Sequence, residues 1–309
     1  MEINFQVMIN FGSHIVQEQN TDTCIKYLAS QKKIYNTGKL TFTTQVLIAV
    51  PIPIIISIIV PLLNNAEYNI TWTFILYSII ATFIELFLEG KTCDLKKLAA
   101  SIQELFDSKV LLIDWNSILI PKQPESEVIF HYYNKFVKKY SLDKLYDWYP
   151  KEIESVKTNV ATLLCQRVNC NYDFTLRKRY SNSILVLALI TFIILFVISG
   201  IFDITLTSFV TNVLFPSLPV FVLAYKQIAN NKDAIENLND LKNLIESELR
   251  TVKITDCIDN YLIRQIQDKI YLKRINSPLV PEWAYNLLRQ NLEDEMHFSV
   301  NDKIRELSV

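Results

Sequence analysis

Glycine and histidine are scarce in this sequence, and their scarcity removes several classes of functional site. Only four of the 309 residues are glycine, namely Gly12, Gly38, Gly90 and Gly200. A phosphate-binding P-loop and a dinucleotide-binding turn both need several glycines within a few residues, so neither motif is present. The three histidines are His14, His131 and His297. None has a serine, cysteine or carboxylate partner at a recognisable motif spacing, and we therefore expect no enzymatic activity.

The cysteines are too scattered to predict a metal site. They are Cys24, Cys93, Cys165, Cys170 and Cys257, and no two of them form a C-x-x-C pair. Cys165 and Cys170 lie close in sequence, but the ligand spacing of a structural zinc site is missing. All five fall in segments that we predict to lie in the reducing cytoplasm, where disulfides are rare. We therefore predict neither a metal ion nor a disulfide.

Lysine and arginine are absent from two long stretches of the chain. No basic residue occurs between Lys39 and Lys91 or between Arg179 and Lys226. The two gaps hold four apolar stretches, residues 46–63, 71–88, 183–202 and 206–225. The third has no charged residue inside its apolar run, and as a helix it spans roughly 30 Å, the thickness of a bilayer's hydrocarbon core. The sequence predicts a mainly α integral membrane protein with four transmembrane helices in two hairpins.

The distribution of the basic residues predicts the topology of these hairpins. All 31 lie in residues 1–39, 91–179 and 226–309. The positive-inside rule places these three segments, and both termini, in the cytoplasm. The first 40 residues are polar and charged, so we expect no cleavable signal peptide. The net charge of −1 argues against a nucleic acid as the partner.

We expect five segments along the chain. They are a cytoplasmic amphipathic segment (1–39), a transmembrane hairpin (40–89), a mostly helical cytoplasmic domain (90–182), a second transmembrane hairpin (183–226) and a cytoplasmic helical tail (227–309). Apolar spacing predicts a helix over 14–39 that lies at the cytoplasmic face, a helix over 94–107 that continues inward from the second span, and one long helix from 152 into the third span. Residues 227–275 form either one long helix or a helical hairpin, and a last helix covers 283–307.

Polar side chains within the spans are candidates for lining a pore. Ser78, Thr82, Glu85 and Glu89 recur at steps of four, three and four, which places them on one helical face. A carboxylate in a span is costly and normally faces water or protein. Glu85 also lies close enough to the cytoplasmic end to reach the interface. Ser208 and Asn212 form a second candidate set in the fourth span, although such residues are equally typical of helix packing.

Prolines in the first and fourth spans are candidate hinges. They are Pro51, Pro53, Pro61, Pro216 and Pro219. A proline inside a helix removes one backbone donor and bends the rod, a defect that membranes tolerate when neighbouring groups satisfy the freed carbonyls. Each of these prolines is therefore either a hinge for a conformational change or a fixed feature of helix shape.

Five stretches together resemble the SMODS-associating four-transmembrane effector family. They are YLASQKKIY (27–35), SIQELFDSKVLLIDWN (101–116), DWYP (147–150), CQRVNCNYDFTLRKRY (165–180) and IQDKIYLKRINSPLVPEW (266–283). They cover most of the predicted cytoplasmic parts in the family's order around two hairpins. Tyr172 departs from the tryptophan of the family pattern but keeps an aromatic ring.

The resemblance implies a role in CBASS-type anti-phage defence. A partner CD-NTase makes a cyclic di- or oligonucleotide on infection, and the effector oligomerises in the bacterial inner membrane and opens a pore, which causes growth arrest or cell death (abortive infection). A phosphate-bearing ligand needs arginine or lysine donors and aromatic faces. The middle domain offers Trp148, Gln166, Arg167, Asn169, Tyr172 and Arg177.

Two alternatives stay open at this point. Arg167 and Arg177 either contact a ligand or pair with Asp147, Glu152 or Asp173 in the packing of the domain itself. The whole protein is either a ligand-gated pore, a membrane scaffold that recruits partners without forming a pore, or a channel that needs no ligand.

Overall fold

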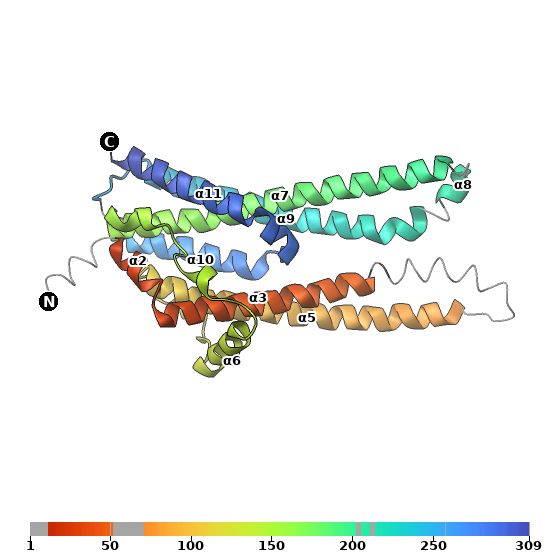
Figure 1. The fold of residues 1–309 in the computed structure, drawn as a ribbon, viewed down its shortest axis with the longest axis horizontal. Helices are drawn as coiled ribbons and strands as arrows, with labels where there is room; N and C mark the ends of the chain where they lie inside the picture. Colours follow the sequence, from red (N-terminus) through yellow and green to blue (C-terminus); the bar gives the residue numbers. More distant parts are fainter. Residues whose placement is uncertain are drawn as a thin grey trace.

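Long helices run side by side along the greatest dimension of the molecule (Figure 1). The computed structural model describes residues 12–49, 51, 71–201, 205–210, 214–256 and 258–308. Every regular element within these ranges is a helix, as the sequence predicts. The helices gather into a bundle at the end that holds the C-terminus, and two pairs of helices extend from this bundle toward the other end.

The helices have the following bounds. They are α2 (Ser13–Glu18), α3 (Asp22–Ala49), α5 (Thr71–Val110), α6 (Ser126–Val137), α7 (Thr158–Ile201), α8 (Leu206–Phe209), α9 (Phe215–Leu249), α10 (Asn260–Asn276) and α11 (Glu282–Leu307), with short 3₁₀ helices η1 (Asp143–Leu145) and η2 (Lys151–Ser155).

The first pair consists of α3 and α5, which pack against each other. α5 runs without a break from the predicted second span into the amphipathic stretch 94–107, which confirms that predicted continuation. Ile102 and Phe106 of this stretch are fully buried in the bundle. One continuous helix therefore connects the apolar part of this pair to the core.

The second pair consists of α7 and α9. α7 is the predicted long helix, but it begins at Thr158 and not at residue 152. The chain before it is held against Gly12, whose amide donates to the Val156 carbonyl at 2.7 Å. A Cβ atom at Gly12 would lie 2.0 Å from the Ile153 carbonyl oxygen, so only glycine permits this approach. This contact keeps residues 153–156 out of the α-helix.

The tail is a helical hairpin followed by one more helix. α9 ends at Leu249 and α10 begins at Asn260, so the hairpin is the correct form of the two predicted for residues 227–275. The Asp259 carboxylate accepts from the Tyr261 amide at 3.0 Å and caps the start of α10. α11 begins at Glu282, one residue before the predicted position.

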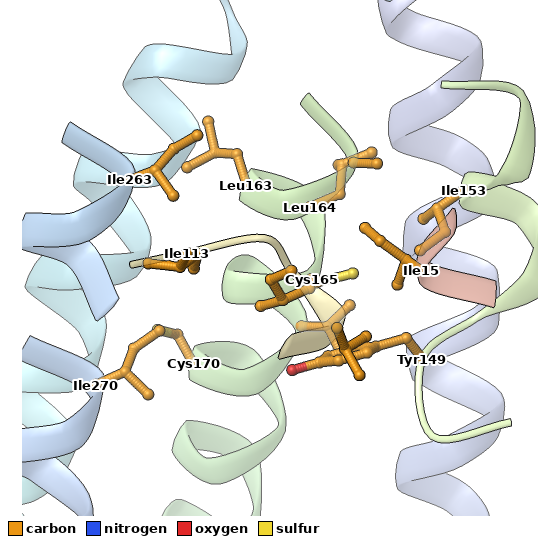
Figure 2. Close-up of a cluster of buried hydrophobic side chains, with 14 of the residues drawn as sticks. Ile15, Ile113, Tyr149, Ile153, Leu163, Leu164, Cys165, Cys170, Ile263 and Ile270 are labelled. Atoms are coloured by element: carbon orange, nitrogen blue, oxygen red, sulfur yellow. The ribbon is translucent and has the colours of Figure 1, made fainter. Parts of the chain in front are cut away.

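The core lies where α2, α3, α5, α7 and α10 meet. Figure 2 shows Leu163 and Cys165 of α7 among side chains from α2, α10 and the segment around Tyr149. In the segment 14–39, Leu28 and Ile34 are fully buried, because α5 and α6 cover the apolar side of α3. The segment therefore contributes to the core, and its position at the cytoplasmic face stays a prediction.

The part of α7 beyond the bundle exposes apolar side chains. Leu187, Ile193 and Phe196 are each more than half exposed. Within the described residues, one helix, covering Thr158–Val197, is long and apolar enough to cross a membrane. The arrangement of four spans remains a prediction.

The predicted pore and hinge residues are described to different extents. Ser78 and Thr82 lie in α5, Ser208 lies in α8, and Pro216 and Pro219 lie in α9. Pro216 is in the first turn of α9, where the missing N–H of a proline leaves no helical hydrogen bond unmade. Pro51 is described without its neighbours, and Pro53, Pro61 and Asn212 lie outside the described residues. Glu85 and Glu89 face a hollow that is described below.

Candidate functional site

A cavity of about 480 Å³ opens in the bundle between α3, α7, the segment around η1 and the start of α11. Its lining combines basic, acidic and aromatic side chains, and the acidic residues are Asp143, Asp147, Asp173, Glu282 and Glu293. The basic residues are Lys32, Lys39, Lys144, Arg177, Lys273, Arg274 and Arg289, and the aromatic residues are Tyr35, Tyr146, Trp148, Tyr172 and Tyr285. We call this space the ligand cavity.

Helical spacing explains why these side chains converge. On α3, Lys32, Tyr35 and Lys39 recur at steps of three and four and lie on one face. On α11, Tyr285 and Arg289 are four residues apart and also share a face. α7 contributes its cavity residues in the same way, at positions 169, 172, 173, 176 and 177. Three helices therefore each present one polar stripe to the same space.

The segment that carries Trp148 is fixed by α2 and the turn after it. Asn20 and Asp147 exchange two hydrogen bonds, each of 2.9 Å, one through the Asp147 amide and one through its carboxylate. Gln19 likewise accepts from the Tyr149 amide at 2.7 Å. Asp147 has a φ of 53°, a left-handed conformation that aspartate tolerates better than most residues. These contacts set the position of the indole at the cavity wall.

Lys32 is the most unusual charge in the ligand cavity. Its pKa is lowered to about 8, first by burial and then by the neighbouring cations Arg289, Lys39 and Lys144, against the opposing effect of Glu282. Within the described part of the chain, no carboxylate lies within ion-pair distance of the Lys32 or Lys144 ammonium group. Lys39 and Arg289, by contrast, pair with Glu282 and Glu293. A bound anion would pair with the ammonium groups of Lys32 and Lys144.

Arg177 also lines the ligand cavity, and it makes three hydrogen bonds within the protein. Its Nε donates to Asp173 at 2.9 Å, and its Nη1 donates to the Asn231 side chain at 3.0 Å and to the Pro278 carbonyl at 2.8 Å. Its pairing with Asp173 is one of the alternatives open from the sequence. Although it lines the ligand cavity, the Arg177 side chain is only 9% exposed.

A buried polar network forms the floor of the ligand cavity. Arg274 donates to Asp107 at 2.6 Å, and the Tyr149 hydroxyl donates to the same carboxylate at 2.8 Å. Asn169 donates to the Tyr149 hydroxyl at 3.0 Å. Burial, together with the nearby Asp107 charge, raises the pKa of Glu104, which lies 3.8 Å from Arg274. Such a connected network holds the floor in one arrangement.

The six residues proposed from the sequence do not all meet. Trp148, Asn169, Tyr172 and Arg177 line the ligand cavity, whereas Gln166 and Arg167 do not. Gln166 is buried and donates to the Ile263 carbonyl at 2.9 Å. Arg167 lies elsewhere on α7 and pairs with Glu246 of α9, a partner that was not among the three expected from the sequence.

Other cavity residues were not singled out from the sequence. Lys144 and Arg289 stand alone in their own stretches, and no pattern in one segment points to them. A signal did exist for Lys32, Tyr35 and Lys273, because they lie inside the stretches that carry the family resemblance. The family resemblance marks these segments, but it does not indicate which of their side chains line the same cavity.

A second hollow, of about 610 Å³, lies between the two helix pairs. Glu85 and Glu89 of α5 line it opposite Lys226 and Asp233 of α9. Two of the predicted pore-lining residues therefore share a polar space at the base of both pairs. We call this space the inter-pair hollow.

Cys165 and Cys170, the two cysteines closest in sequence, are both buried. Burial raises the pKa of the Cys170 thiol to about 12 and raises that of Cys165 well above its usual value. Both thiols are therefore protonated core side chains at neutral pH.

Comparison with known proteins agrees over nearly the whole chain. The sequence model of the SMODS-associating 4TM effector domain matches residues 13–303. A protein of Bacillus cereus (strain VD146) named as a probable CBASS effector molecule is 28% identical over 302 residues, which cover 95% of this chain and 99% of that protein. No solved structure matches. The chain therefore belongs to the SMODS-associating 4TM effector family.

Proposed function

We propose that this protein is a membrane effector of CBASS-type anti-phage defence, and that the ligand cavity binds a cyclic di- or oligonucleotide made by a partner CD-NTase. Binding opens a pore of assembled subunits in the bacterial inner membrane and arrests or kills the infected cell. The observation that carries the proposal is the set of closely placed cations around Lys32, in a cavity lined with aromatic rings.

The two kinds of lining residue match the two parts of a nucleotide. Phosphate oxygens form strong, charge-assisted hydrogen bonds with lysine and arginine donors. Bases stack on aromatic side chains, and each stack is worth about 1–3 kcal/mol. Lys32 and Arg177 both line the ligand cavity, and Tyr35, Trp148 and Tyr285 add aromatic rings to its wall. A ligand that carries both phosphates and bases uses both features.

Family membership and the exposed apolar part of α7 support a membrane location. In the proposed arrangement four helices span the membrane and both termini lie in the cytoplasm. Four helices rarely enclose a wide pore alone, so the protein acts as a homo-oligomer. The inter-pair hollow, with Glu85 and Glu89, forms the cytoplasmic entrance of the conducting path.

Titration calorimetry on the purified, full-length protein tests ligand binding. The probes are cyclic di-GMP, cyclic GMP–AMP and cyclic tri-AMP, and the same compounds are then added to liposomes that contain the protein and a trapped dye. We expect one compound to bind and to trigger dye release. No binding and no release with any of them would favour a scaffold, whereas release without any compound would favour a ligand-independent channel.

Lys32→Ala identifies the site. We expect it to weaken binding of the active compound about tenfold or more, since it removes one charge-assisted contact with a phosphate. Lys33→Ala is the matched control, because Lys33 is the next residue of α3 and does not line the ligand cavity. Equal affinity of the two variants would place the ligand elsewhere.

A further inference from the structure

The linker between α10 and α11, residues 277–281, separates the ligand cavity from the inter-pair hollow. Ser277, Pro278 and Leu279 line both spaces, and so does Lys273 in the last turn of α10. These residues therefore form a wall common to both spaces, so a displacement of the linker changes both of them.

Both helix pairs hold this linker in place. From the first pair, the Lys96 ammonium group of α5 donates to the Ser277 carbonyl at 3.2 Å. From the second pair, Arg177 of α7 donates to the Pro278 carbonyl at 2.8 Å. Leu279 packs on α3 at Gly38, where an added Cβ atom would lie 3.2 Å from the leucine Cδ1 atom. The linker therefore ties the two pairs together at the inter-pair hollow.

A ligand in the cavity competes with the linker for Arg177. Arg177 is a lining residue of the ligand cavity, and its guanidinium group donates to the Pro278 carbonyl through the Nη1 atom. A phosphate is a stronger acceptor for this group than a neutral carbonyl. A ligand shifts a conformational equilibrium only through contacts that differ between the two states. The contact between Arg177 and phosphate is such a contact, because it forms fully when the linker is released.

We propose that the linker is the element that couples ligand binding to pore opening, an inference that rests on the proposed function. The ligand draws Arg177 away from the Pro278 carbonyl, the linker loses its tie to α7, and the two helix pairs separate at the inter-pair hollow. Lys96 stabilises the closed state from the side of the inter-pair hollow. It donates a hydrogen bond to the Ser277 carbonyl and does not line the ligand cavity.

Lys96→Met tests this coupling at a residue that does not itself line the ligand cavity. We expect the nucleotide concentration for half-maximal dye release to fall about tenfold, because a hydrogen bond from a charged donor to the linker is lost. The leak without nucleotide is expected to rise for the same reason. Lys97→Met is the matched control, since Lys97 is exposed and lines neither space.

A second pair of variants tests the packing of the linker. Leu279→Ala removes its contact with α3 and is expected to shift release in the same direction as Lys96→Met. Adding Gly38→Ala to Leu279→Ala returns a methyl group to the vacated space, and we expect this double variant to move back toward the wild-type response. Circular dichroism and size-exclusion chromatography confirm that each variant is folded.

The results separate failure of the coupling from failure of the proposed function. Wild-type release midpoints and leak rates in both Lys96→Met and Leu279→Ala would overturn the coupling, even if nucleotide binds. If no nucleotide binds the wild-type protein, the proposed function fails, and the coupling is decided by the leak without nucleotide. A higher leak in Lys96→Met than in Lys97→Met would then support the linker as the closing element, and equal leaks would overturn it.

Discussion

Lys32 carries a positive charge in surroundings that disfavour it. Its pKa of about 8 lies below the usual 10.5, first because it is buried and then because other cations surround it. Between pH 8 and pH 10.5 the unfolded chain holds a proton that the folded protein has lost, so the free energy of unfolding gains a contribution that rises with pH in this window. Below pH 8 the full cost of burying the charge is present.

The lowered pKa of Lys32 predicts how the affinity for a nucleotide depends on pH. A bound phosphate favours the charged form of Lys32, so we expect affinity to be greatest below pH 8 and to fall as pH rises through about 8. Calorimetry at pH 7 and pH 9 measures the change, and buffers with different ionisation enthalpies report proton uptake on binding near pH 8. Lys32→Met should flatten the profile. The same pH profile in wild type and Lys32→Met would show that another group is responsible.

At the residue level, the sequence indicates which types of residue to expect in a cavity better than it indicates which individual residues line it. Arginine and aromatic residues were expected around a phosphate, and four of the six named residues line one cavity. Arg167 shows the limit, because its partner Glu246 lies in α9, 79 positions away, and no local pattern indicates that pairing. Tertiary contacts decide whether a charged side chain forms an ion pair within the protein, and a local sequence pattern does not show them.

At the level of elements, periodicity predicted most helices, since apolar residues at helical spacing mark the buried face. The continuous α5, the end of the tail hairpin and the start of α11 all follow from that pattern and from the prolines near residue 280. The start of α7 was predicted too early because apolar residues at 153 and 156 suit an α-helix equally well. The hydrogen bonds of Val156 with Gly12 and of Lys157 with Ile254, both distant in sequence, hold this segment in another conformation.

α7 joins the ligand cavity to the exposed apolar segment in one unbroken helix. Its cavity residues end at Arg177, and its exposed apolar residues begin at Leu185. Asn182→Pro, at an exposed position between them, removes a helical hydrogen bond and kinks the rod at a cost of about 3 kcal/mol or more. We expect nucleotide binding to be retained and dye release to be reduced strongly. Asn182→Ala serves as the control, and normal release by the proline variant would mean that α7 does not transmit the signal.

At the scale of the whole molecule, the two stretches without lysine or arginine include the first half of α5 and the last part of α7, and their place in a membrane stays a prediction. The bundle collects side chains from segments that are distant in sequence, while the helix pairs extend away from it (Figure 1). The cavity and the inter-pair hollow both lie where several segments converge, so neither can be located from the sequence of any one of them. The family match over residues 13–303 covers bundle and pairs together, which fits a protein whose parts work as one unit.

If pore opening requires the pairs to separate, linking them should prevent it. Cys93 of α5 and Asn230 of α9 line opposite sides of the inter-pair hollow, so Asn230→Cys places a second thiol across from a natural one. A flexible bis-maleimide that contains a reducible disulfide then joins the pairs. We expect the linked protein to bind nucleotide with unchanged affinity but to release little dye, and to recover when the reagent is cleaved. The wild-type protein treated in the same way controls for modification of Cys93 alone. Full release from the linked protein would show that the conducting path opens without movement between the pairs, and would place it between subunits.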